Sequence, residues 1–326
     1  MPTPQVSVLM TVYNGLPYLK EAIDSILNQT LEEFQFIIVD DGSTDATSDF
    51  IKSIDDPRIV LVHQENGGTA AAANHGLSLV ETEFVARMDA DDVAIADRLE
   101  KQLQFMEANL DVGIVGAQVS PVGDVAIGKS LNLPETHDDI FRALMTGRHG
   151  LAHSSLMIRT AKLKELGGYW KHRLIDDWDM MLRMGEVSRL ANLPDVLLNY
   201  RVHSGSLNGT SMMRMHRHIG YAIDCAKRRQ KDTATISYED FQNLKSAEPI
   251  WSRISERIHV YALTQYRLAV ADIFGGRRIS GYLRLGWSAL CSPSRTVQRF
   301  GRILKTKKAR SIKANSGSPA QVLDGV

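Results

Sequence analysis

Short apolar runs and amphipathic stretches alternate along the first 90 residues of the chain. The apolar runs lie at residues 6–12, 36–39, 59–62 and 84–88. Runs of this length with little polar interruption are typical of strands buried on both faces of a parallel sheet. Between them, apolar residues recur at the spacing of a helix face, as in the alanine-rich segment 69–79. The alternation predicts an α/β fold whose mostly parallel, Rossmann-like sheet carries helices on both faces.

The pattern continues less regularly between residues 98 and 201. Periodicity predicts a helix at 98–109 and a strand at 112–119. Glycine and proline are frequent in residues 120–150, which predicts loops and one short helix at 138–145. The remaining expected elements are a strand at 151–158, a turn at Gly167 and Gly168, a helix that begins at Asp176, and a last strand at 196–201.

The chain after residue 210 has helical spacing and no further predicted strand. Two long helices are predicted at 254–274 and 279–290. Lysine and arginine are frequent from residue 293, and the chain ends in a stretch with Gly, Ser and Pro, a composition typical of disorder. We expect a first domain at 1–210 with halves at about 1–118 and 119–210, a helical extension at 211–292, and a basic, disordered tail at 293–326.

The formal net charge of zero hides two regions of opposite sign. Residues 1–200 carry 16 Lys and Arg against 30 Asp and Glu, whereas residues 201–326 carry 22 against 8. An acidic region can hold cations, and a basic region can either meet an anionic surface or pair with the acidic region. Both alternatives stay open for the basic region, and we expect no binding of nucleic acid.

Cysteine usage and hydropathy bear on the cellular compartment. Cys225 and Cys291 form neither a disulfide framework nor a metal-ligand spacing, which suits a reducing cytoplasm. No run approaches the roughly 18 apolar residues of a membrane span, and the first residues do not resemble a signal peptide. We expect a cytoplasmic protein that is at most peripheral at the inner face of the cell membrane.

The apolar run at 84–88 ends in three carboxylates within four residues, Asp89, Asp91 and Asp92. Two carboxylates about 4 Å apart repel each other by about 4 kcal/mol at an effective dielectric constant of about 20. Magnesium or manganese relieves such crowding, because these hard cations take carboxylate and diphosphate oxygens as ligands. A solvated acidic loop without a metal would have the same residues. The choice between these two interpretations therefore depends on the surrounding sequence.

Polar residues follow each of the four predicted strands. They are Thr11 and Tyr13, Asp40 and Asp41, residues 66–68, and the acidic triplet. In doubly wound sheets, ligands bind in the crevice outside the carboxyl ends of the strands. We therefore expect these residues to line one ligand site.

The order of these motifs resembles the family 2 inverting glycosyltransferases, which have the GT-A fold. The resemblance covers about residues 5–206 and rests on the whole series of motifs. They are residues 6–14, Val-Asp-Asp-Gly-Ser-Thr-Asp at 39–45, Asn-Gly-Gly at 66–68, Ala-Arg-Met-Asp-Ala-Asp-Asp at 86–92, Gly-Gly-Tyr at 167–169, Asp-Asp-Trp-Asp at 176–179 and Tyr-Arg-Val-His at 200–203. The resemblance implies that the first domain has a nucleotide-binding half and an acceptor half.

The resemblance also implies how a nucleotide-sugar donor is bound. Arg201 and His203 would bind its diphosphate, because arginine can donate two parallel hydrogen bonds to phosphate oxygens. The Asp41 carboxylate would accept the ring N–H of uracil or thymine. The implied nucleotide contacts together are Thr11, Tyr13, Asp41, Asn66, Gly67 and Asp89. Asp40 could instead orient its loop or cap the following helix.

One position departs from the family pattern. Ala73 stands where arginine is common before Asn74, so a cationic contact to the nucleotide is absent at this position. Arg87 or His75 could supply the charge instead, and donor preference could differ accordingly.

The remaining implied roles concern the metal and the chemistry. Asp91 is the expected direct ligand of Mg²⁺ or Mn²⁺, with Asp89 as its partner and His203 as a further candidate, while Asp92 supports the loop. Asp177 is the expected catalytic base, and Asp176 replaces the glutamate that usually precedes it. Acidic residues at a helix start are also favoured by the helix dipole alone. His153 and Trp178 would line the acceptor side, although His153 could equally be an ordinary packed histidine.

These roles predict a metal-dependent inverting glycosyltransferase. It would move a sugar from a nucleotide sugar, most simply a UDP-sugar, with dTDP- or GDP-sugars as variants. The acceptor would be a hydroxyl of a saccharide or a lipid-linked molecule in surface polysaccharide or glycolipid synthesis. A nucleotidyltransferase is the enzymatic alternative, but no glycine-rich phosphate loop with a catalytic lysine follows the first strand. A non-catalytic scaffold that binds membrane or partners through its basic helices is the alternative from another class.

Overall fold

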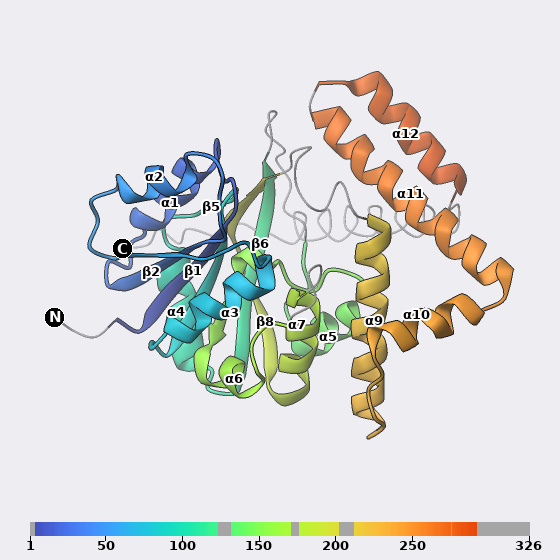
Figure 1. The fold of residues 1–326 in the computed structure, drawn as a ribbon, viewed down its shortest axis with the longest axis horizontal. Coiled ribbons are helices and arrows are strands. Elements are labelled where there is room, and N and C mark those ends of the chain that lie inside the picture. Colours follow the sequence, from blue (N-terminus) through green and yellow to red (C-terminus); the bar gives the residue numbers. More distant parts are fainter. Residues whose placement is uncertain (1–3, 123–131, 171–175, 202–211, 275, 292–326) are drawn as a thin grey trace, which may run out of the picture. The chain divides into compact units, whose positions relative to one another are not determined.

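The computed structural model describes residues 4–122, 132–170, 176–201, 212–274 and 276–291. These residues form one eight-stranded sheet in the order β3-β2-β1-β4-β7-β6-β8-β5, drawn in Figure 1. The strands are β1 (Val6–Val12), β2 (Phe34–Asp40), β3 (Ile59–His63), β4 (Phe84–Asp89), β5 (Val93–Ala94), β6 (Val112–Val122), β7 (Met157–Arg159) and β8 (Arg189–Arg201). The predicted mostly parallel sheet is confirmed.

Strand direction divides the sheet. Strands β3, β2, β1 and β4 run parallel to one another, whereas β7 lies antiparallel between β4 and β6. Strand β8 pairs in parallel with β6, and β5 pairs antiparallel with β8. The sequence did not predict β5 or the first half of β8. A strand of two residues is too short for a periodic pattern, and β8 contains Pro194, which lowers strand propensity.

The segment 151–158 differs from its predicted strand. A short 3₁₀ helix, η1 (His153–Ser155), occupies its middle, and β7 begins only at Met157. The Ser155 hydroxyl donates to the carbonyl of Ala152 over 2.8 Å, and the Ser154 hydroxyl accepts the N–H of Asp89 over 3.0 Å. Such bonds between serine side chains and backbone compete with a strand ladder. The strand prediction was therefore wrong for the first part of this segment.

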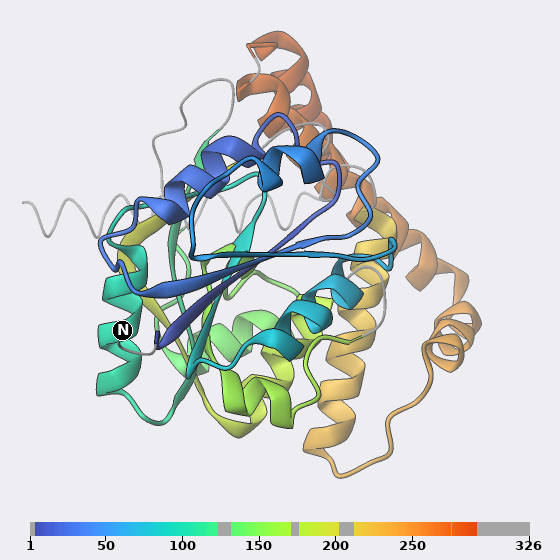
Figure 2. The same cartoon turned by 60° about the vertical axis from the view of Figure 1, so that its left-hand side comes forward.

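Helices cover both faces of the sheet, as predicted. They are α1 (Leu19–Leu27), α2 (Thr47–Lys52), α3 (Thr69–Leu79), α4 (Arg98–Ala108), α5 (His137–Met145), α6 (Thr160–Glu165) and α7 (Asp176–Val187). Successive side chains of a strand point to opposite faces. Leu9 of β1 therefore belongs to the core under α3 and α7, whereas Val8 and Met10 belong to the core under α1 and α4. Figure 2 shows helices on either side of these strands.

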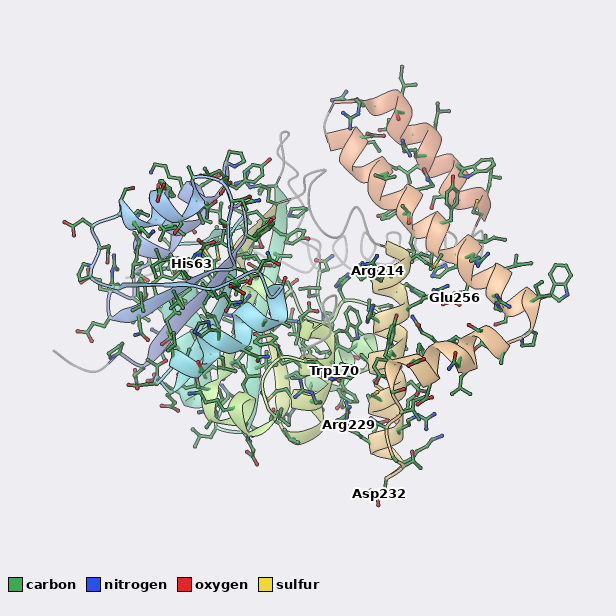
Figure 3. All side chains as sticks on the ribbon, in the orientation of Figure 1. His63, Trp170, Arg214, Arg229, Asp232 and Glu256 are labelled. Carbon is green, nitrogen blue, oxygen red and sulfur yellow. The ribbon has the colours of Figure 1, made fainter. Side chains whose placement is uncertain are left out.

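The compact unit that contains the sheet extends to Ala247 and includes α9 (Met212–Gln230) and α10 (Tyr238–Ala247). The Arg229 guanidinium of α9 donates to both carboxylate oxygens of Glu186 in α7, over 2.7 and 3.0 Å. The Trp170 ring stacks on that of Tyr221 with centroids 4.9 Å apart, and Figure 3 labels Trp170 and Arg229. Helix α9 is therefore attached to the sheet unit by both charge and aromatic packing.

A second compact unit begins at Glu248 and contains α11 (Ile250–Phe274) and α12 (Arg278–Cys291). The predicted helical character of the C-terminal part is confirmed. The boundary at residue 210 stays a prediction, and the tail at 293–326 lies outside the described residues. Within the described ranges, no helix combines the length and the apolar character that a membrane span requires.

Candidate active site

The register of the parallel strands brings the predicted donor residues to one edge of the sheet. Thr11 of β1 lies opposite Asp89 of β4, and Val12 lies opposite Asp40 of β2. Neighbouring strands are about 4.8 Å apart, so these residues are close neighbours. The expectation that the polar strand ends meet at one edge agrees with this register.

Asp41 organises the turn that follows β3. Its Oδ1 accepts hydrogen bonds from the N–H of Gly67 and from Gln64 Nε2, and its Oδ2 accepts the N–H of Gly68, all within 2.9 Å. Asn66 Nδ2 donates to the carbonyl of Asp41 over 3.0 Å. The structure thus joins the predicted nucleotide residues Asp41, Asn66 and Gly67. A carboxylate oxygen can accept two hydrogen bonds, which leaves Oδ2 able to accept a ring N–H as well.

Asp40 is wholly buried and supports the loop after β2. Its Oδ1 accepts the N–H of Ser43, and its Oδ2 lies 3.0 Å from His63 Nδ1. Burial by itself would raise the pKa of Asp40, but the hydrogen bonds from Ser43 and His63 hold that pKa below its ordinary value. Asp40 therefore orients the loop, one of the two alternatives kept for it.

Tyr13 lies on a loop that is tied to the loop after β2. The side chain of Asn14 accepts the N–H of Thr44 over 2.9 Å, and the N–H of Asn14 donates to the hydroxyl of Ser43 over the same distance. Tyr13 itself is exposed. A fixed backbone with an exposed aromatic ring suits the stacking of a nucleobase.

The three carboxylates of the acidic loop occupy different environments. Asp92 is buried, and its Oδ1 accepts the N–H of Arg201 over 2.8 Å. Burial, followed by the negative charges of Asp89 and Asp91, raises the pKa of Asp92 well above its ordinary value. Asp89 and Asp91 remain partly exposed. The loop therefore offers Asp89 and Asp91 to a ligand and uses Asp92 to hold its own backbone.

The donor set of this loop fits half of a magnesium or manganese site. No group of three His, Cys, Asp or Glu residues gathers around one point in the described ranges. Such cations are commonly held by one or two protein carboxylates, with waters and substrate phosphates as the other ligands. Asp89 and Asp91 match that pattern, and the buried Oδ2 of Asp92 has no hydrogen-bond partner in the described structure. His203, the further candidate, lies outside the described residues.

A buried arginine lies beneath Asp89. Arg87 is fully buried, its Nη1 donates to the carbonyl of Leu9 over 2.9 Å, and its Nη2 lies 3.7 Å from Asp89 Oδ1. Its guanidinium carbon lies 5.7 Å from the centroid of the Tyr169 ring. The charge that Ala73 cannot provide is therefore present in this region on Arg87, whereas Ala73 itself is buried in the core.

A second buried arginine, Arg98 of α4, holds the same strand end from the other side. Its Nη2 donates to the carbonyl of Arg87 over 2.7 Å, and its Nε donates to Gln102 Oε1. Burial lowers the pKa of Arg98 to about 10, although the charges of Asp92 and Asp89 partly oppose this effect. No role for Arg98 was predicted from the sequence. An arginine in the first turn of a helix opposes the helix dipole, and this unfavourable position was the available signal of a tertiary partner.

His153, which was predicted to line the acceptor side, contacts Arg87. Arg87 Nε donates to His153 Nε2 over 3.4 Å, so we assign the proton of the neutral ring to Nδ1, which lies 3.9 Å from Asp89 Oδ1. Burial and the charge of Arg87 lower the pKa of His153, and the charges of Asp89 and Asp177 oppose this. Both carboxylates therefore act on the ring of His153.

The ring of Tyr169 packs edge-on against His153, with centroids 5.7 Å apart. Asn74 of α3 fixes the backbone of Tyr169, because its side chain bonds both the N–H and the carbonyl of that residue over 2.8 Å. The Gly-Gly-Tyr turn is thus attached to α3. No role for Asn74 was predicted from the sequence. Its neighbour Ala73 was singled out instead, because it departs from the family pattern.

Helix α7 carries the predicted base. Asp177 Oδ1 accepts the N–H of Trp178 over 2.8 Å, and its position in the first turn of the helix is one that the helix dipole favours for a negative charge. Trp178 is buried in the core, and its Nε1 lies 3.3 Å from the carbonyl of Leu144. Asp179 pairs with Arg183, which donates to the carbonyls of Leu166 and Gly168 and so fixes α7 to the Gly-Gly turn. The acceptor-side role of Trp178 stays a prediction, and its burial leaves little of the ring to contact a ligand.

Arg201 ends β8 beside the acidic loop. Its Nε donates to the carbonyl of Asp91 over 2.7 Å, its guanidinium carbon lies 4.5 Å from the centroid of Tyr18, and its Nη2 pairs with Glu21. The predicted contact with a diphosphate would therefore replace or share the contact with Glu21. No role for Glu21 was predicted from the sequence.

Comparison with known proteins identifies relatives of this chain. The profile of Glycosyl transferase family 2 matches residues 7–167. An uncharacterized glycosyltransferase of Haemophilus influenzae is 31% identical over 239 residues, which cover 65% of this chain and 69% of that protein. The amylovoran biosynthesis glycosyltransferase AmsE of Erwinia amylovora is 29% identical over 211 residues, 62% of this chain and 78% of AmsE.

Solved structures share the fold. Residues 1–349 of S. aureus TarS, in complex with UDP-GlcNAc, superpose with a TM-score of 0.60 at 16% identity, covering 90% of this chain and 92% of the other. The mannosyltransferase PcManGT of Pyrobaculum calidifontis, in complex with GDP-Man and Mn²⁺, gives a TM-score of 0.54 at 18% identity, covering 96% and 84%. These structures show the fold of the chain, whereas the family profile and the 31% identity to the Haemophilus influenzae protein establish that the chain belongs to glycosyl transferase family 2.

Proposed function

We propose that this glycosyltransferase is a metal-dependent, inverting enzyme that uses a UDP-sugar. The main observation in support is the register of β1 and β4, which puts Asp89 beside Thr11 at the carboxyl edge of the sheet. We propose a saccharide or lipid-linked acceptor in the synthesis of a surface polysaccharide or glycolipid. The similarity to an amylovoran biosynthesis enzyme and to a protein solved with UDP-GlcNAc supports this choice. A GDP-sugar, as bound by PcManGT, or a dTDP-sugar is the nearest alternative donor.

The residues around Asp41 support a nucleotide-binding role for this edge of the sheet. The free acceptor capacity of Asp41 Oδ2 suits the ring N–H of uracil, and the exposed ring of Tyr13 suits stacking on the base. Thr11 and Asp89 would contact the ribose side, with Asn66 and Gly67 forming the wall of the pocket.

Asp91 and Asp89 would hold Mg²⁺ or Mn²⁺ against the diphosphate. When bound, the cation would neutralise the charge that develops on the leaving nucleoside diphosphate. Arg201 and His203 would contribute further positive or hydrogen-bonding groups to the same phosphates. Arg87, paired with Asp89 from below, would keep that carboxylate oriented toward the ligand.

Asp177 would take the proton of the acceptor hydroxyl as that oxygen attacks the anomeric carbon. Its position at the start of α7 and its electrostatic influence on His153 support a place on the acceptor side, opposite the donor edge. One displacement with no covalent enzyme intermediate inverts the anomeric configuration. His153, kept neutral, would offer its Nδ1 proton to a sugar or phosphate oxygen near Asp89.

Donor hydrolysis tests the proposal, since water can replace the unidentified acceptor. Full-length protein is incubated with a panel of UDP-, dTDP- and GDP-sugars, with Mn²⁺, with Mg²⁺ or with chelator. Asp177→Asn should lower the rate by about 10²- to 10⁴-fold, the usual contribution of a general base. Asp195→Asn is the matched control, because this carboxylate pairs with Lys101 at an exposed site and should leave the rate unchanged. Equal rates in wild type and Asp177→Asn would contradict the assignment.

The stereochemical outcome is a separate test. Proton NMR of the sugar first released from an α-linked UDP-sugar should show the β anomer. An α anomer would indicate retention and would remove the single-displacement mechanism, whatever the role of Asp177.

A peripheral position at the inner face of the cell membrane would place the enzyme at a lipid-linked acceptor. The charge distribution supports it, since 22 of the 38 Lys and Arg residues lie after residue 200. Lysine and arginine near an anionic membrane surface each contribute about 1 kcal/mol to binding. We propose a cytoplasmic enzyme with such contact and no role in nucleic acid binding.

A further inference from the structure

The α11–α12 hairpin packs through small residues. A Cβ atom added to Gly281 would lie 2.4 Å from Ile273 Cγ1 and 2.8 Å from the carbonyl oxygen of Ala269. About two turns further along the helix, the Ser288 hydroxyl donates to the carbonyl of Ala262 over 2.7 Å. Small residues of this kind let two helix backbones approach closely, as they do at helix contacts in membranes. The inner face of α12 therefore has no large apolar side chain at these positions.

Most of the large apolar side chains of α12 lie on the opposite side, with Leu285 as the exception. Ile279, Leu283 and Leu290 are 81%, 71% and 75% exposed. At about 100° per residue, these three fall within about 40° of one another and roughly opposite Gly281 and Ser288. Tyr282 and Trp287 flank them and are also exposed. We call Ile279, Tyr282, Leu283, Trp287 and Leu290 the α12 apolar face.

Most of the large apolar side chains of α12 thus face outward, which is the opposite of their usual placement in an amphipathic helix of a water-soluble protein. Such a helix buries its apolar stripe against the core and shows a polar face to solvent. Contiguous exposed apolar surface marks a contact with a membrane, a ligand or another protein. The Tyr and Trp on the edges of the α12 apolar face combine an apolar ring with a polar atom, the combination enriched at membrane–water interfaces.

The charge of the sequence from residue 248 onward favours one of these contacts over the others. Asp272 is the sole acidic residue in the sequence between Glu256 and Asp324, and from residue 248 onward 14 Lys and Arg stand against 4 Asp and Glu. Asp272 is buried and neutralised, because its carboxylate accepts hydrogen bonds from Arg277 and Arg284 over 2.7 to 2.9 Å. A second copy of so cationic a unit would repel the first, whereas an anionic lipid surface would attract it.

We propose that the α12 apolar face inserts into the interface of an anionic lipid bilayer. The helix has 14 residues, or about 21 Å at about 1.5 Å per residue, so it lies along the surface instead of crossing it. The inference deepens the proposed function, on whose lipid-linked acceptor its purpose rests. It assigns the membrane contact to a named helix face, and the basic residues of the C-terminal region add attraction to the lipid headgroups.

Vesicle flotation of the full-length protein tests whether the α12 apolar face binds the bilayer. Vesicles of equimolar phosphatidylcholine and phosphatidylglycerol should bind wild-type protein, and vesicles of phosphatidylcholine alone should bind it more weakly. Leu283→Ser with Leu290→Ser should lower the partition coefficient at least about tenfold, which corresponds to about 1.4 kcal/mol. The matched control is Leu110→Ser with Leu244→Ser, two exposed leucines of the sheet unit, which should partition as wild type. Equal partitioning of both double variants would overturn the inference.

A second measurement does not depend on the folding of the leucine variant. In a Trp251→Phe background, lipids brominated in their acyl chains should quench the fluorescence of Trp287, and Trp287→Phe should abolish that part of the quenching. Absence of quenching on anionic vesicles would overturn the insertion. Sedimentation velocity completes the test: a dimer that dissociates in the leucine variant while vesicle binding is retained would show a second copy as the occupant and would also overturn it.

Donor hydrolysis without vesicles separates this inference from the proposed function. The leucine variant should retain the wild-type rate with a soluble nucleotide sugar while losing vesicle binding. If wild-type protein hydrolysed no donor but still bound anionic vesicles through the α12 apolar face, the proposed function would fail and the membrane inference would stand.

Discussion

Arg87 and Asp89 form a pair in which the cation is fully buried and the carboxylate reaches solvent, with 3.7 Å between Nη2 and Oδ1. The two residues are two positions apart on one strand, so their side chains project from the same face of β4. A buried charge is normally retained only where it is paired or hydrogen-bonded. Arg87 meets this requirement through its contacts with Leu9, His153 and Asp89, and it thereby connects the first strand, the short helix η1 and the acidic loop.

Arg87→Met should destabilise the protein and alter His153. Loss of the charged hydrogen bond to the Leu9 carbonyl should lower the free energy of unfolding by about 1.5 to 3 kcal/mol. The charge of Arg87 is, after burial, the main cause of the low pKa of His153, so this pKa should rise. Urea unfolding and NMR titration of the histidine ring measure the two effects.

Arg87→Lys is the matched control for the charge. It should keep the pKa of His153 near the wild-type value but still lower stability, because an ammonium group cannot reproduce the planar fork of hydrogen bonds. A pKa of His153 that stays unchanged in Arg87→Met would contradict an electrostatic link between the two residues.

The acidic loop should respond differently to substitution at Asp91 and at Asp92. Asp91→Asn should lower donor hydrolysis by at least about 100-fold, since even outer-sphere partners of a metal commonly matter by 10- to 100-fold. Asp92→Asn should lower it by less than about tenfold, because the amide oxygen can still accept the N–H of Arg201. Isothermal titration of Mn²⁺ into each variant with UDP gives a readout independent of turnover. Equal losses at both positions would contradict the division of roles in this loop.

The pattern of apolar residues predicted the sheet well because that pattern depends on local burial. The first strand and the helix at 69–79 have the expected bounds. The prediction of a strand at 151–158 was wrong where the side chains of Ser154 and Ser155 form hydrogen bonds with the backbone. Such bonds leave no periodic pattern of apolar residues in the sequence. The strand register that brings Thr11 beside Asp89 depends on pairing across more than 70 residues, and no local pattern encodes it.

The candidate site was predictable to the extent that its residues lie in short motifs. Asp41 and the Asn-Gly-Gly turn were named together, and the structure shows the hydrogen bonds that join them. Arg98 could not be found in this way, because two of its partners are backbone carbonyls, those of Arg87 in β4 and of Leu156 just before β7. Backbone carbonyls have no sequence signature, so a buried cation that binds them looks like an ordinary surface arginine.

Gly42→Ala should weaken nucleotide binding more than its strain alone explains. Gly42 has a φ of +75°, and an added Cβ would lie 2.8 Å from the backbone nitrogen of Asn66. The clash should displace the turn that Asp41 holds and lower UDP affinity by at least about tenfold, or about 1.4 kcal/mol. Gly167→Ala is the control, because this glycine has a φ of +80° with no atom within 4 Å of an added Cβ. It should lose about 1 to 2 kcal/mol of stability from backbone strain and retain UDP affinity.

Asp40→Asn should destabilise the protein in a pH-dependent way. The pKa of Asp40 is below its ordinary value in the folded state, so its carboxylate stabilises the fold above the unfolded pKa near 3.8. This contribution disappears as the pH falls through the folded pKa. The stability difference between wild type and variant should therefore be full at pH 7 and shrink in acid below about pH 4. Urea unfolding across that range measures it, and a constant difference would contradict a role for the ionised form.

Glu21→Gln should strengthen donor binding if Arg201 serves the diphosphate. The Glu21 carboxylate pairs with Arg201 Nη2 and would compete with phosphate oxygens for the same guanidinium. Exposed ion pairs contribute about 0 to 1 kcal/mol, so the Kd for UDP should fall by up to about fivefold. Glu83→Gln is the matched control, since Glu83 is a comparably exposed carboxylate that pairs with Arg159, opposite the amino end of β4. Its Kd should equal that of wild type, and weaker UDP binding in Glu21→Gln would instead show that Glu21 orients Arg201 for the ligand.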